Sequence, residues 1–301
     1  MLVHERQMMK QLLLIVLLIL QTLVFTVSAT AKTTPEFKIT GSEVRTLTAK
    51  NLSRSYNLYI KVPKGYNEIE NAHRKYPVIF FNDGGYCWLT AVGATRAPFN
   101  LGGYEHAILV GFSYAKGEKN INSRVRDYTP TSNPKWKFET GGAKAYLDFI
   151  KDEAIPFIEG QYRIDSDRRM IVGHSLGGLF GTYALLEEPN LFADYILTSS
   201  SLWFHEEVIF DIEEKFYNTG KQLKGRIFFA IGETETPEIN GGNNDMVGQQ
   251  RAFANQLRSR NYEGLEVKDI IYEDGTHLTT YPIGLTEGLR WLLPGKDVFG
   301  G

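Results

Sequence analysis

Five residues near the middle of the chain, Gly173-His174-Ser175-Leu176-Gly177, combine a nucleophilic side chain with the spacing of a catalytic turn. An apolar run over 170–172 precedes them, and leucine and tyrosine side chains follow at helical spacing. A G-x-S-x-G pattern between a strand and a helix is typical of a nucleophile elbow, whose strained turn presents the serine hydroxyl above a sheet. The pattern therefore predicts Ser175 as a nucleophile. The alternative is a glycine-rich turn that carries an incidental serine.

A serine hydroxyl is a weak nucleophile at neutral pH unless a base accepts its proton and a third group orients that base. In the α/β folds that use this elbow, the acid follows the serine along the chain and the histidine comes last. His277 fits the base, because it lies just beyond an apolar run over 267–272, and parallel sheets form their sites at the carboxyl ends of their strands. The alternative for His277 is a solvated loop histidine.

The acid is expected after the preceding apolar run, 227–231, where several carboxylates compete. Glu235 is the first choice, because a carboxylate a few residues beyond the strand end reaches best toward a histidine on the neighbouring loop. Glu233 is the reserve. Asp245 is a third candidate, which we favour less because the segment 240–244 before it has a loop composition. For each of them the alternative is an ordinary surface acid.

Acyl transfer also needs hydrogen-bond donors for the negative charge that develops on the carbonyl oxygen. The backbone amide of Leu176, the residue after the nucleophile, is one expected donor. The other is expected from the loop over 82–86, where paired glycines leave the backbone open to a substrate oxygen. Gly85 is the residue predicted for this role, and the alternative is a plain tight turn.

These side chains need a sheet to position them, and the order of the elements predicts one. Short apolar runs rich in β-branched and aromatic residues are typical of strands buried on both faces; they cover 78–81, 107–112, 170–172, 195–198, 227–231 and 267–272. Helical periodicity covers 143–158, 246–257 and 285–293. Pro156 is expected to bend or end the first of these helices. The prediction is an α/β sandwich with a mostly parallel central sheet and helices on both faces.

Two further strands, 43–52 and 55–62, are expected to form an antiparallel hairpin at the edge of this sheet.

Residues 1–31 have the pattern of a secretory signal peptide. Lys10 supplies a positive charge, 12–27 is an almost unbroken apolar run, and Ala29-Thr30-Ala31 offers a cleavage site. The alternative is a single membrane anchor, but the apolar run is short for a bilayer span. We therefore expect a cleaved leader, a single domain over 32–301, and a secreted or periplasmic protein with no membrane attachment after cleavage.

The composition narrows the classes of partner. The chain of 301 residues has a formal net charge of −2 at pH 7, which argues against a nucleic-acid partner, since that needs a basic surplus on one face. Cys87 is the only cysteine, which excludes an internal disulfide and a metal–thiolate site. We expect no metal and no organic cofactor.

With these residues placed, the chain resembles the esterase D-like family of α/β-hydrolases, which includes S-formylglutathione hydrolases, feruloyl and acetylxylan esterases, mycolyltransferases and enterobactin-type siderophore esterases. The likeness is nearest to the siderophore-esterase branch and runs from about Val44 to Leu293. The segments that carry it are Tyr76-Pro77, Asp83-Gly84, Arg126-Asp127-Tyr128-Thr129-Pro130, Gly141-Gly142, Gly173-His174-Ser175-Leu176-Gly177-Gly178, Ser201-Leu202-Trp203 and Gly232-Glu233-Thr234-Glu235. The elbow is common to many hydrolases, whereas the blocks that begin at Arg126 and Ser201 are far more specific.

This resemblance implies an α/β-hydrolase fold with Ser175 as nucleophile and His277 as base. It implies less about the acid, because members of the branch vary there and some are described as working with little more than a Ser-His pair. One departure concerns the pocket wall. Relatives usually carry Ser-Pro-Ser-Leu-Trp-Trp where this chain has Ser199-Ser200-Ser201-Leu202-Trp203-Phe204.

Arg126 and Trp203 are the residues predicted to bind substrate. A guanidinium binds anionic or oxygen-rich groups, and an indole supplies an aromatic wall; Arg124, Phe204, Tyr86 and Trp88 are further candidates of the same kinds. The alternatives are that Arg126 pairs with a structural acid and that the aromatic side chains fill the core.

Together these features predict an exported serine ester hydrolase that acts through an acyl enzyme on a small-molecule ester, of siderophore type or another polar kind. Two alternatives remain open. An acyltransferase on the same scaffold would replace water by an alcohol, and a binding protein would keep the fold without the activity.

Overall fold

The computed structural model describes residues 2–24, 37–239 and 244–296, which divide into two units. The first unit, residues 1–39, contains helix α1 (Leu2–Val24). Within the described ranges, no helix is both long and apolar enough to cross a membrane. The expected cleavage site at Ala29-Thr30-Ala31 lies outside the described residues, so the signal peptide stays a prediction.

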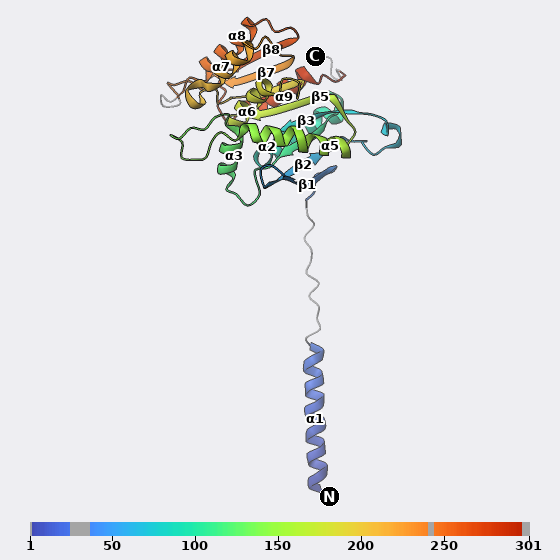
Figure 1. Cartoon of the computed structure of the whole chain (residues 1–301). Helices are drawn as coiled ribbons and strands as arrows, with labels where there is room; N and C mark the ends of the chain where they lie inside the picture. Colours follow the sequence, from blue (N-terminus) through green and yellow to red (C-terminus); the bar gives the residue numbers. More distant parts are fainter. Residues whose placement is uncertain (1, 25–36, 240–243, 297–301) are drawn as a thin grey trace. The chain divides into compact units, whose positions relative to one another are not determined.

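The second unit, residues 40–301, is built on one sheet, which in the described part of the chain has the strand order β1-β2-β4-β3-β5-β6-β7-β8 (Figure 1). Its strands are β1 (Ser42–Ala49), β2 (Arg54–Lys61), β3 (Tyr76–Phe81), β4 (Ile108–Phe112), β5 (Ile164–His174), β6 (Asp194–Thr198), β7 (Gly225–Gly232) and β8 (Leu265–Tyr272). β2 pairs antiparallel with β1 and β4, whereas the other neighbours pair parallel. The predicted sheet with its antiparallel edge hairpin is confirmed.

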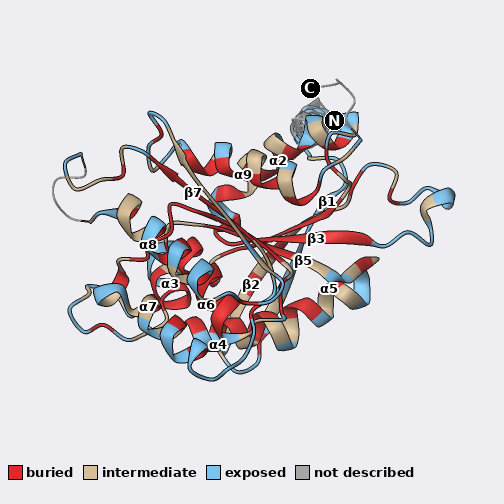
Figure 2. Ribbon diagram, turned by 90° about the horizontal axis from the view of Figure 1, so that it is seen from above, coloured by how far each residue is buried: buried red, intermediate tan, exposed pale blue. Residues whose placement is uncertain are grey.

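Helices cover both faces of this sheet. They are α2 (Gly84–Leu101), α3 (Asn120–Tyr128), α4 (Ala143–Phe149), α5 (Ile155–Gln161), α6 (Leu176–Glu187), α7 (Phe204–Tyr217), α8 (Met246–Ser259) and α9 (Thr280–Leu292), with a short 3-10 helix, η1 (Ile69–Asn71). α2 and α9 pack together on one face, and α3 to α8 lie on the other (Figure 2). The predicted arrangement of helices on both faces is therefore confirmed.

The burial of the strands explains why their sequences contain unbroken apolar runs. Every residue of β3, β4 and β6 is buried, because helices cover both of their faces. β1, at the edge, is mostly exposed, and Figure 2 shows the buried residues concentrated in the centre of the second unit.

Two helices differ from the sequence prediction. Pro156 does not end its helix, because a π-helical turn, η2 (Ile150–Ala154), joins α4 to α5 and places the proline in the first turn of α5. α2 begins at Gly84, so the segment over 82–86, expected as a loop, contains the start of a helix.

Candidate active site

The turn between β5 and α6 has the strained geometry that its sequence predicted. β5 ends at His174, α6 begins at Leu176, and Ser175 between them has φ 59° and ψ −120°. A serine with positive φ is uncommon and costs on the order of 1–3 kcal/mol. The fold therefore holds this side chain in a conformation that an unconstrained chain would avoid.

The glycines around Ser175 are required by space. A Cβ atom on Gly173 would lie 2.1 Å from the carbonyl oxygen of Gly177, and one on Gly178 would lie 2.4 Å from Ser200 Oγ. Neither position accepts a larger residue without a shift of the backbone or of a buried side chain. The glycines of the elbow allow the strand, the turn and the helix to approach this closely.

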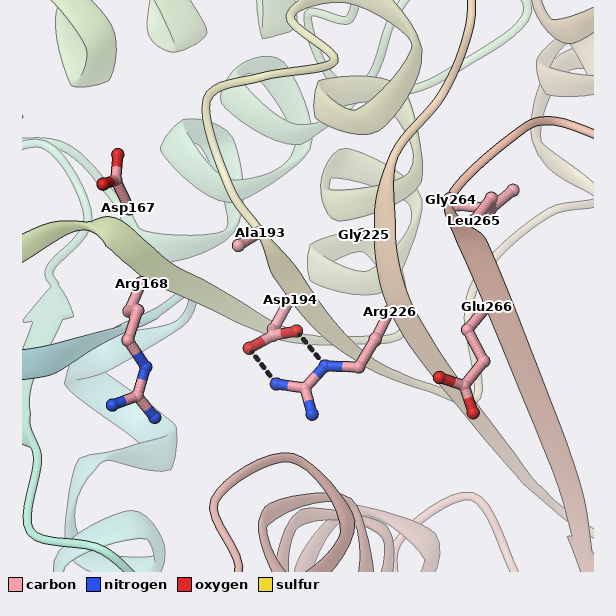
Figure 3. Close-up of a pocket in the computed structure, with 9 residues that line it drawn as sticks. All are labelled: Asp167, Arg168, Ala193, Asp194, Gly225, Arg226, Gly264, Leu265 and Glu266. Atoms are coloured by element: carbon pink, nitrogen blue, oxygen red, sulfur yellow. Dashed lines mark hydrogen bonds and ion pairs between the residues drawn. The ribbon is translucent and has the colours of Figure 1, made fainter.

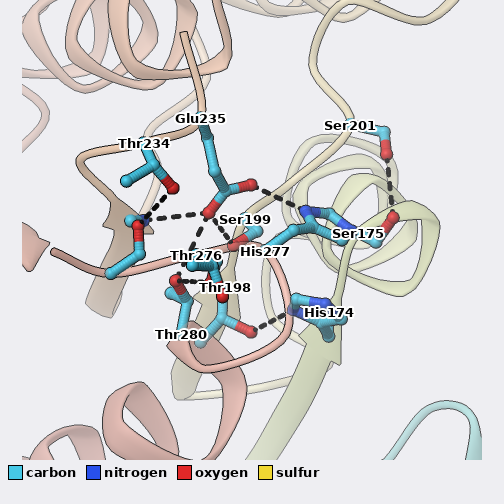
Figure 4. Close-up of polar contacts among 12 residues, drawn as sticks. His174, Ser175, Thr198, Ser199, Ser201, Thr234, Glu235, Thr276, His277 and Thr280 are labelled. Atoms are coloured by element: carbon cyan, nitrogen blue, oxygen red, sulfur yellow. Dashed lines mark hydrogen bonds and ion pairs between the residues drawn. The ribbon is translucent and has the colours of Figure 1, made fainter. Parts of the chain in front are cut away.

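A carboxylate and an imidazole meet at the same edge of the sheet, beyond the ends of β7 and β8. Glu235 Oε2 lies 2.6 Å from His277 Nδ1. In the view of Figure 4, the imidazole lies between this carboxylate and Ser175. Glu235 is almost completely buried, whereas the His277 side chain is 40% exposed. The structure thus brings together the acid and the base that the sequence favoured.

The second oxygen of Glu235 is also held. Oε1 accepts hydrogen bonds from Ser199 Oγ at 2.6 Å and from the Gly232 amide at 2.9 Å. Burial raises the pKa of the Glu235 carboxyl, but the hydrogen bonds from His277, Ser199 and Gly232 outweigh it and hold this pKa below its usual value. Glu235 is therefore ionised at neutral pH, as a group that orients an imidazole must be.

The two other acids considered have different contacts. Glu233 Oε2 accepts from the backbone amide of Asp274 at 3.2 Å. Asp245 caps the first turn of α8, where its Oδ1 accepts from the Gly248 amide at 2.8 Å. In the described structure, Glu235 is thus the only one of the three that contacts His277.

The hydroxyl of Ser175 contacts another serine. Its Oγ lies 3.3 Å from Ser201 Oγ, and among the described residues no hydrogen bond joins it to His277. Catalytic hydrogen bonds are often long without substrate and tighten when it binds. The contact with Ser201 was not anticipated from the sequence.

A second histidine, His174, lies against the base. Its ring centroid is 4.6 Å from that of His277, and its Nδ1 is 2.9 Å from Thr198 Oγ1. Burial, followed by the proximity of His277, lowers the pKa of His174 to about 3. His174 is therefore neutral at the pH at which a base would act, and it adds no positive charge beside His277.

Two helix N-termini meet at the position expected for the oxyanion donors. Leu176 is the first residue of α6 and Gly85 lies in the first turn of α2, where backbone amides have no partner within their own helix. Asn82, which precedes α2, donates from Nδ2 to the carbonyl oxygen of Gly177 at 3.0 Å and so ties the two termini together. Such termini favour negative charge.

A buried ion pair supports the start of α2. Arg124 donates to both oxygens of Asp83, at 2.7 and 3.0 Å, and to the carbonyl oxygen of His174 at 3.2 Å. The Tyr114 hydroxyl donates to the same carboxylate at 2.7 Å. Sequence reasoning considered Arg124 as a ligand for anions, whereas its contacts connect α3 to Asp83 and the end of β5.

Arg126 is buried and held by two acids. Its Nη1 is 2.5 Å from Glu118, its Nε is 2.9 Å from Asp127, and its side chain is 6% exposed. Tyr56 adds a hydrogen bond to Asp127 at 3.0 Å. This arrangement favours the alternative in which Arg126 pairs with structural acids.

The aromatic candidates are divided between core and surface. Trp203 is half-buried and stacks on Trp136, with ring centroids 6.0 Å apart, and Phe204 is fully buried. Trp88 packs on Tyr59. Tyr86, which follows Gly85, is 76% exposed, as is Leu278, which follows His277. The interpretation that the aromatic side chains fill the core thus fits Phe204 but not Tyr86. The sequence analysis missed Trp136, because nothing in its local sequence signals the contact with Trp203.

A cavity of about 460 Å³ lies at the opposite edge of the sheet, at the starts of β6, β7 and β8 (Figure 3). Arg226 and Asp194 in it form two hydrogen bonds of 2.8 Å each. These two charges therefore pair with each other, and the cavity lies away from Ser175. In the described parts of the chain, no group of three or more His, Cys, Asp or Glu side chains is placed to hold a metal ion.

Comparison with known proteins assigns this fold to a family. A family model described as "Putative esterase" matches residues 49–282. The chain belongs to this family. The ferri-bacillibactin esterase BesA of Bacillus subtilis (strain 168) is 29% identical over 276 residues, which cover 87% of this chain and 92% of that protein. The family and this relative indicate an ester hydrolase.

Solved structures agree with this assignment. The BES protein from Bacillus cereus has a TM-score of 0.74 at 27% identity, covering 86% of this chain and 97% of its own. An IroE-like serine hydrolase from Shewanella oneidensis has a TM-score of 0.72 at 28% identity, covering 84% and 80%. The α/β-hydrolase fold and the likeness to siderophore esterases, both predicted, are confirmed.

Proposed function

We propose that the protein is an exported serine ester hydrolase that works through an acyl enzyme on Ser175. The observation that carries this proposal is the strained Ser175 at the end of β5 beside the Glu235–His277 pair, whose Oε2 and Nδ1 atoms lie 2.6 Å apart. The esterase family supports the reaction class. The name of the Shewanella oneidensis structure, a serine hydrolase, supports the type of nucleophile.

In the acylation step, Ser175 Oγ attacks the carbonyl carbon of the ester while its proton moves to Nε2 of His277. Glu235 accepts a hydrogen bond from the Nδ1–H of the imidazole, fixes its tautomer and stabilises the imidazolium. The amides of Leu176 and Gly85 donate to the negatively charged oxygen of the tetrahedral intermediate. The intermediate then releases the alcohol, which takes the proton from Nε2.

In the deacylation step, water replaces the alcohol. It transfers a proton to His277 Nε2 while its oxygen attacks the acyl carbon. Ser175 Oγ leaves the second tetrahedral intermediate and recovers its proton from the imidazolium, and the carboxylic acid is released. The protein returns to its starting state, so the net reaction is hydrolysis of one ester bond.

The proposed substrate is a small polar ester of siderophore type. The support is the match to BesA, named a ferri-bacillibactin esterase, over 87% of this chain. Trp203 lies two residues beyond Ser201, whose hydroxyl contacts that of Ser175, and is the proposed aromatic contact. Tyr86 and Leu278 are exposed beside Gly85 and His277. Arg126 is left out of this proposal because two carboxylates already bind it.

The export proposal rests on the signal-peptide pattern of residues 1–31. Expression of the full chain followed by N-terminal sequencing of the protein outside the cytoplasm tests it. A mature N-terminus just after Ala31 is expected. A full-length chain that stays with the membrane would support the anchor alternative.

A fluorophosphonate probe tests the catalytic proposal directly. The full chain and Ser166→Ala, which alters an exposed serine on the same strand, should both be labelled, and peptide mapping should place the label on Ser175. Ser175→Ala should not be labelled. A folded wild-type protein that takes no label would support the binding-protein alternative, and a product ester formed with an added alcohol would support the acyltransferase.

A further inference from the structure

Three consecutive serines, Ser199-Ser200-Ser201, follow β6. Figure 4 shows the first beside Glu235 and the third beside Ser175. All three are buried. Their backbone is tied to neighbouring elements: the Ser199 amide donates to Ala230 in β7 at 2.7 Å, and the Ser201 amide donates to the carbonyl oxygen of Ser175 at 3.0 Å. The segment thus connects the strand that leads to the acid with the turn that carries the nucleophile.

The first serine contacts the acid. Ser199 Oγ donates to Glu235 Oε1 at 2.6 Å, while the other oxygen of this carboxylate contacts His277. Ser199 has φ 44°, a left-handed conformation that is unfavourable for a serine. A glycine would adopt this backbone more easily but would lack the hydroxyl.

The third serine contacts the nucleophile. Ser201 Oγ lies 3.3 Å from Ser175 Oγ. Ser175 has one hydroxyl proton, which in the reactive arrangement must point to His277. Ser201 must then donate its own proton to Ser175 Oγ, which restricts the rotation of the nucleophilic hydroxyl and stabilises negative charge as it develops there.

The middle serine provides an internal comparison. Ser200 Oγ is buried and has no hydrogen-bond partner within the described structure. It shares the burial, the residue type and the segment of its neighbours, but it contacts neither the acid nor the nucleophile.

We propose that Ser199 and Ser201 are positioning residues, of which Ser199 holds Glu235 for His277 and Ser201 holds the hydroxyl of Ser175. This inference rests on the proposed serine hydrolase function. It assigns two separate roles to one tripeptide: Ser199 acts through the acid, and Ser201 acts through the nucleophile.

The test compares Ser199→Ala, Ser200→Ala and Ser201→Ala in the full chain, with steady-state kinetics on a short-chain aryl ester. Loss of one hydrogen bond predicts a kcat that is roughly three- to tenfold lower for the outer two variants, with KM within about twofold of wild type. Ser200→Ala should retain wild-type kcat and KM. Equal losses at all three positions, or no loss at Ser199 and Ser201, would overturn the proposal.

Conservative variants separate the hydroxyl from packing and strain. Ser201→Cys keeps nearly the same volume with a weaker donor, so its kcat should lie between those of wild type and Ser201→Ala. Ser199→Gly removes the backbone strain together with the hydroxyl, and it should lose as much kcat as Ser199→Ala. Recovery of wild-type kcat by Ser199→Gly would show that strain, not the hydroxyl, is responsible.

Double-mutant cycles in the free energy of unfolding test the same contacts without any turnover. The pairs are Ser199 with Glu235, as Ser199→Ala and Glu235→Gln, and Ser201 with Ser175, as two alanine substitutions. We expect each pair to be non-additive, whereas Ser200→Ala should add independently to both. If the wild-type protein hydrolyses no ester, the proposed function fails while these cycles still decide the contacts. Additive cycles would overturn the inference even in an active enzyme.

Discussion

The chain turns differently at the two ends of the strands of the central sheet, which we call its carboxyl edge and its amino edge. At the carboxyl edge, Ser175 and Ser199 have positive φ values of 59° and 44° although neither is glycine. At the amino edge, Gly225 and Gly264 occupy the positions with positive φ at the starts of β7 and β8. Ser175 and Ser199 thus carry backbone strain together with hydroxyls that belong to the catalytic arrangement, whereas Gly225 and Gly264 adopt a positive φ at little cost.

The polar side chains at the two edges also differ, in how fully they are paired with other protein groups. At the amino edge Arg226 and Asp194 form two hydrogen bonds to each other beside the cavity of Figure 3. At the carboxyl edge, the hydroxyl of Ser175 has a single hydrogen-bond contact within the described part of the chain, the 3.3 Å contact with Ser201, and the His277 side chain is part-exposed. A side chain with few protein partners remains available for a substrate.

The largest expected effect comes from the carboxyl edge. Ser175→Ala should lower kcat/KM for an aryl ester by about three orders of magnitude or more, because it removes the nucleophile. The free energy of unfolding should stay within about 0.5 kcal/mol of wild type, and Ser175→Gly should be at least as stable as Ser175→Ala because glycine relieves the strain. Ester assays and urea denaturation measure both. Near-normal turnover by folded Ser175→Ala would contradict the mechanism.

Substitution of Arg126, on α3, tests whether this residue binds substrate or only forms structural ion pairs. Arg126→Met should lower the free energy of unfolding by about 3 kcal/mol, because it leaves Asp127 buried without its cation. KM for an anionic ester and for a neutral aryl ester should change by the same factor in the protein that stays folded. A selective rise in KM for the anionic ester would instead assign Arg126 to substrate binding.

Glu235 tests the choice among three acids at the carboxyl edge. Glu235→Gln should lower kcat by about 100-fold, because the imidazole loses the anion that fixes its tautomer. Glu233→Gln and Asp245→Asn are the matched controls and should lower kcat by less than about threefold. Steady-state kinetics at neutral pH measures all three. A larger loss in Glu233→Gln would transfer the role to that residue, and small losses in all three would favour a Ser-His pair.

A substitution of Gly225, at the amino edge, should affect stability but not catalysis, in contrast to the substitutions at the carboxyl edge. Its φ is 117°, and a Cβ atom there would lie 2.4 Å from the carbonyl oxygen of Ala193. Gly225→Ala should therefore destabilise the protein by about 2 kcal/mol, while kcat for the folded fraction stays at the wild-type value. Thermal denaturation and active-site titration with a fluorophosphonate separate the two. A fall in kcat without a loss of stability would show that the two edges are not independent.

The smallest expected effect is the pH dependence of stability that Glu235 contributes. Its pKa in the folded protein is lowered, so its ionised form stabilises the fold above the usual glutamate value of about 4.3. This contribution is lost as the pH falls through the lowered pKa. The difference in free energy of unfolding between wild type and Glu235→Gln should therefore change between pH 7 and pH 3, toward a relatively less stable wild type. A constant difference over this range would contradict the assignment.

Local patterns were sufficient for the strands and for the elbow. The apolar runs at 78–81 and 195–198 predicted β3 and β6, because strands buried on both faces consist mainly of apolar residues. The G-x-S-x-G pattern predicted the turn at Ser175, because a Cβ atom on Gly173 would collide with the backbone of Gly177, only four residues along the chain. The start of α2 at Gly84 was missed, since Asn82 to Tyr86 has a composition that also suits a tight turn.

Local patterns did not predict which side chains contact one another. Arg126 looked available for an anion in the sequence. Its partners Glu118 and Asp127 are close to it in the chain, but only the folded structure shows that both carboxylates bind it. The block that begins at Ser201 contributed to the family resemblance, but the contacts of Ser199 and Ser201 had no local signal, because parallel strands bring their partners Glu235 and Ser175 to them.

The sequence by itself determined the order of strands and helices, the turn that exposes a serine, and the short list of groups that could assist it. The tertiary structure alone decided which members of that list meet. Glu235 contacts His277 while Glu233 and Asp245 hydrogen-bond to backbone amides. The physical reason is that hydrogen bonds and ion pairs depend on distances of a few ångströms, and only the packing of the strands sets such distances between residues far apart in the chain.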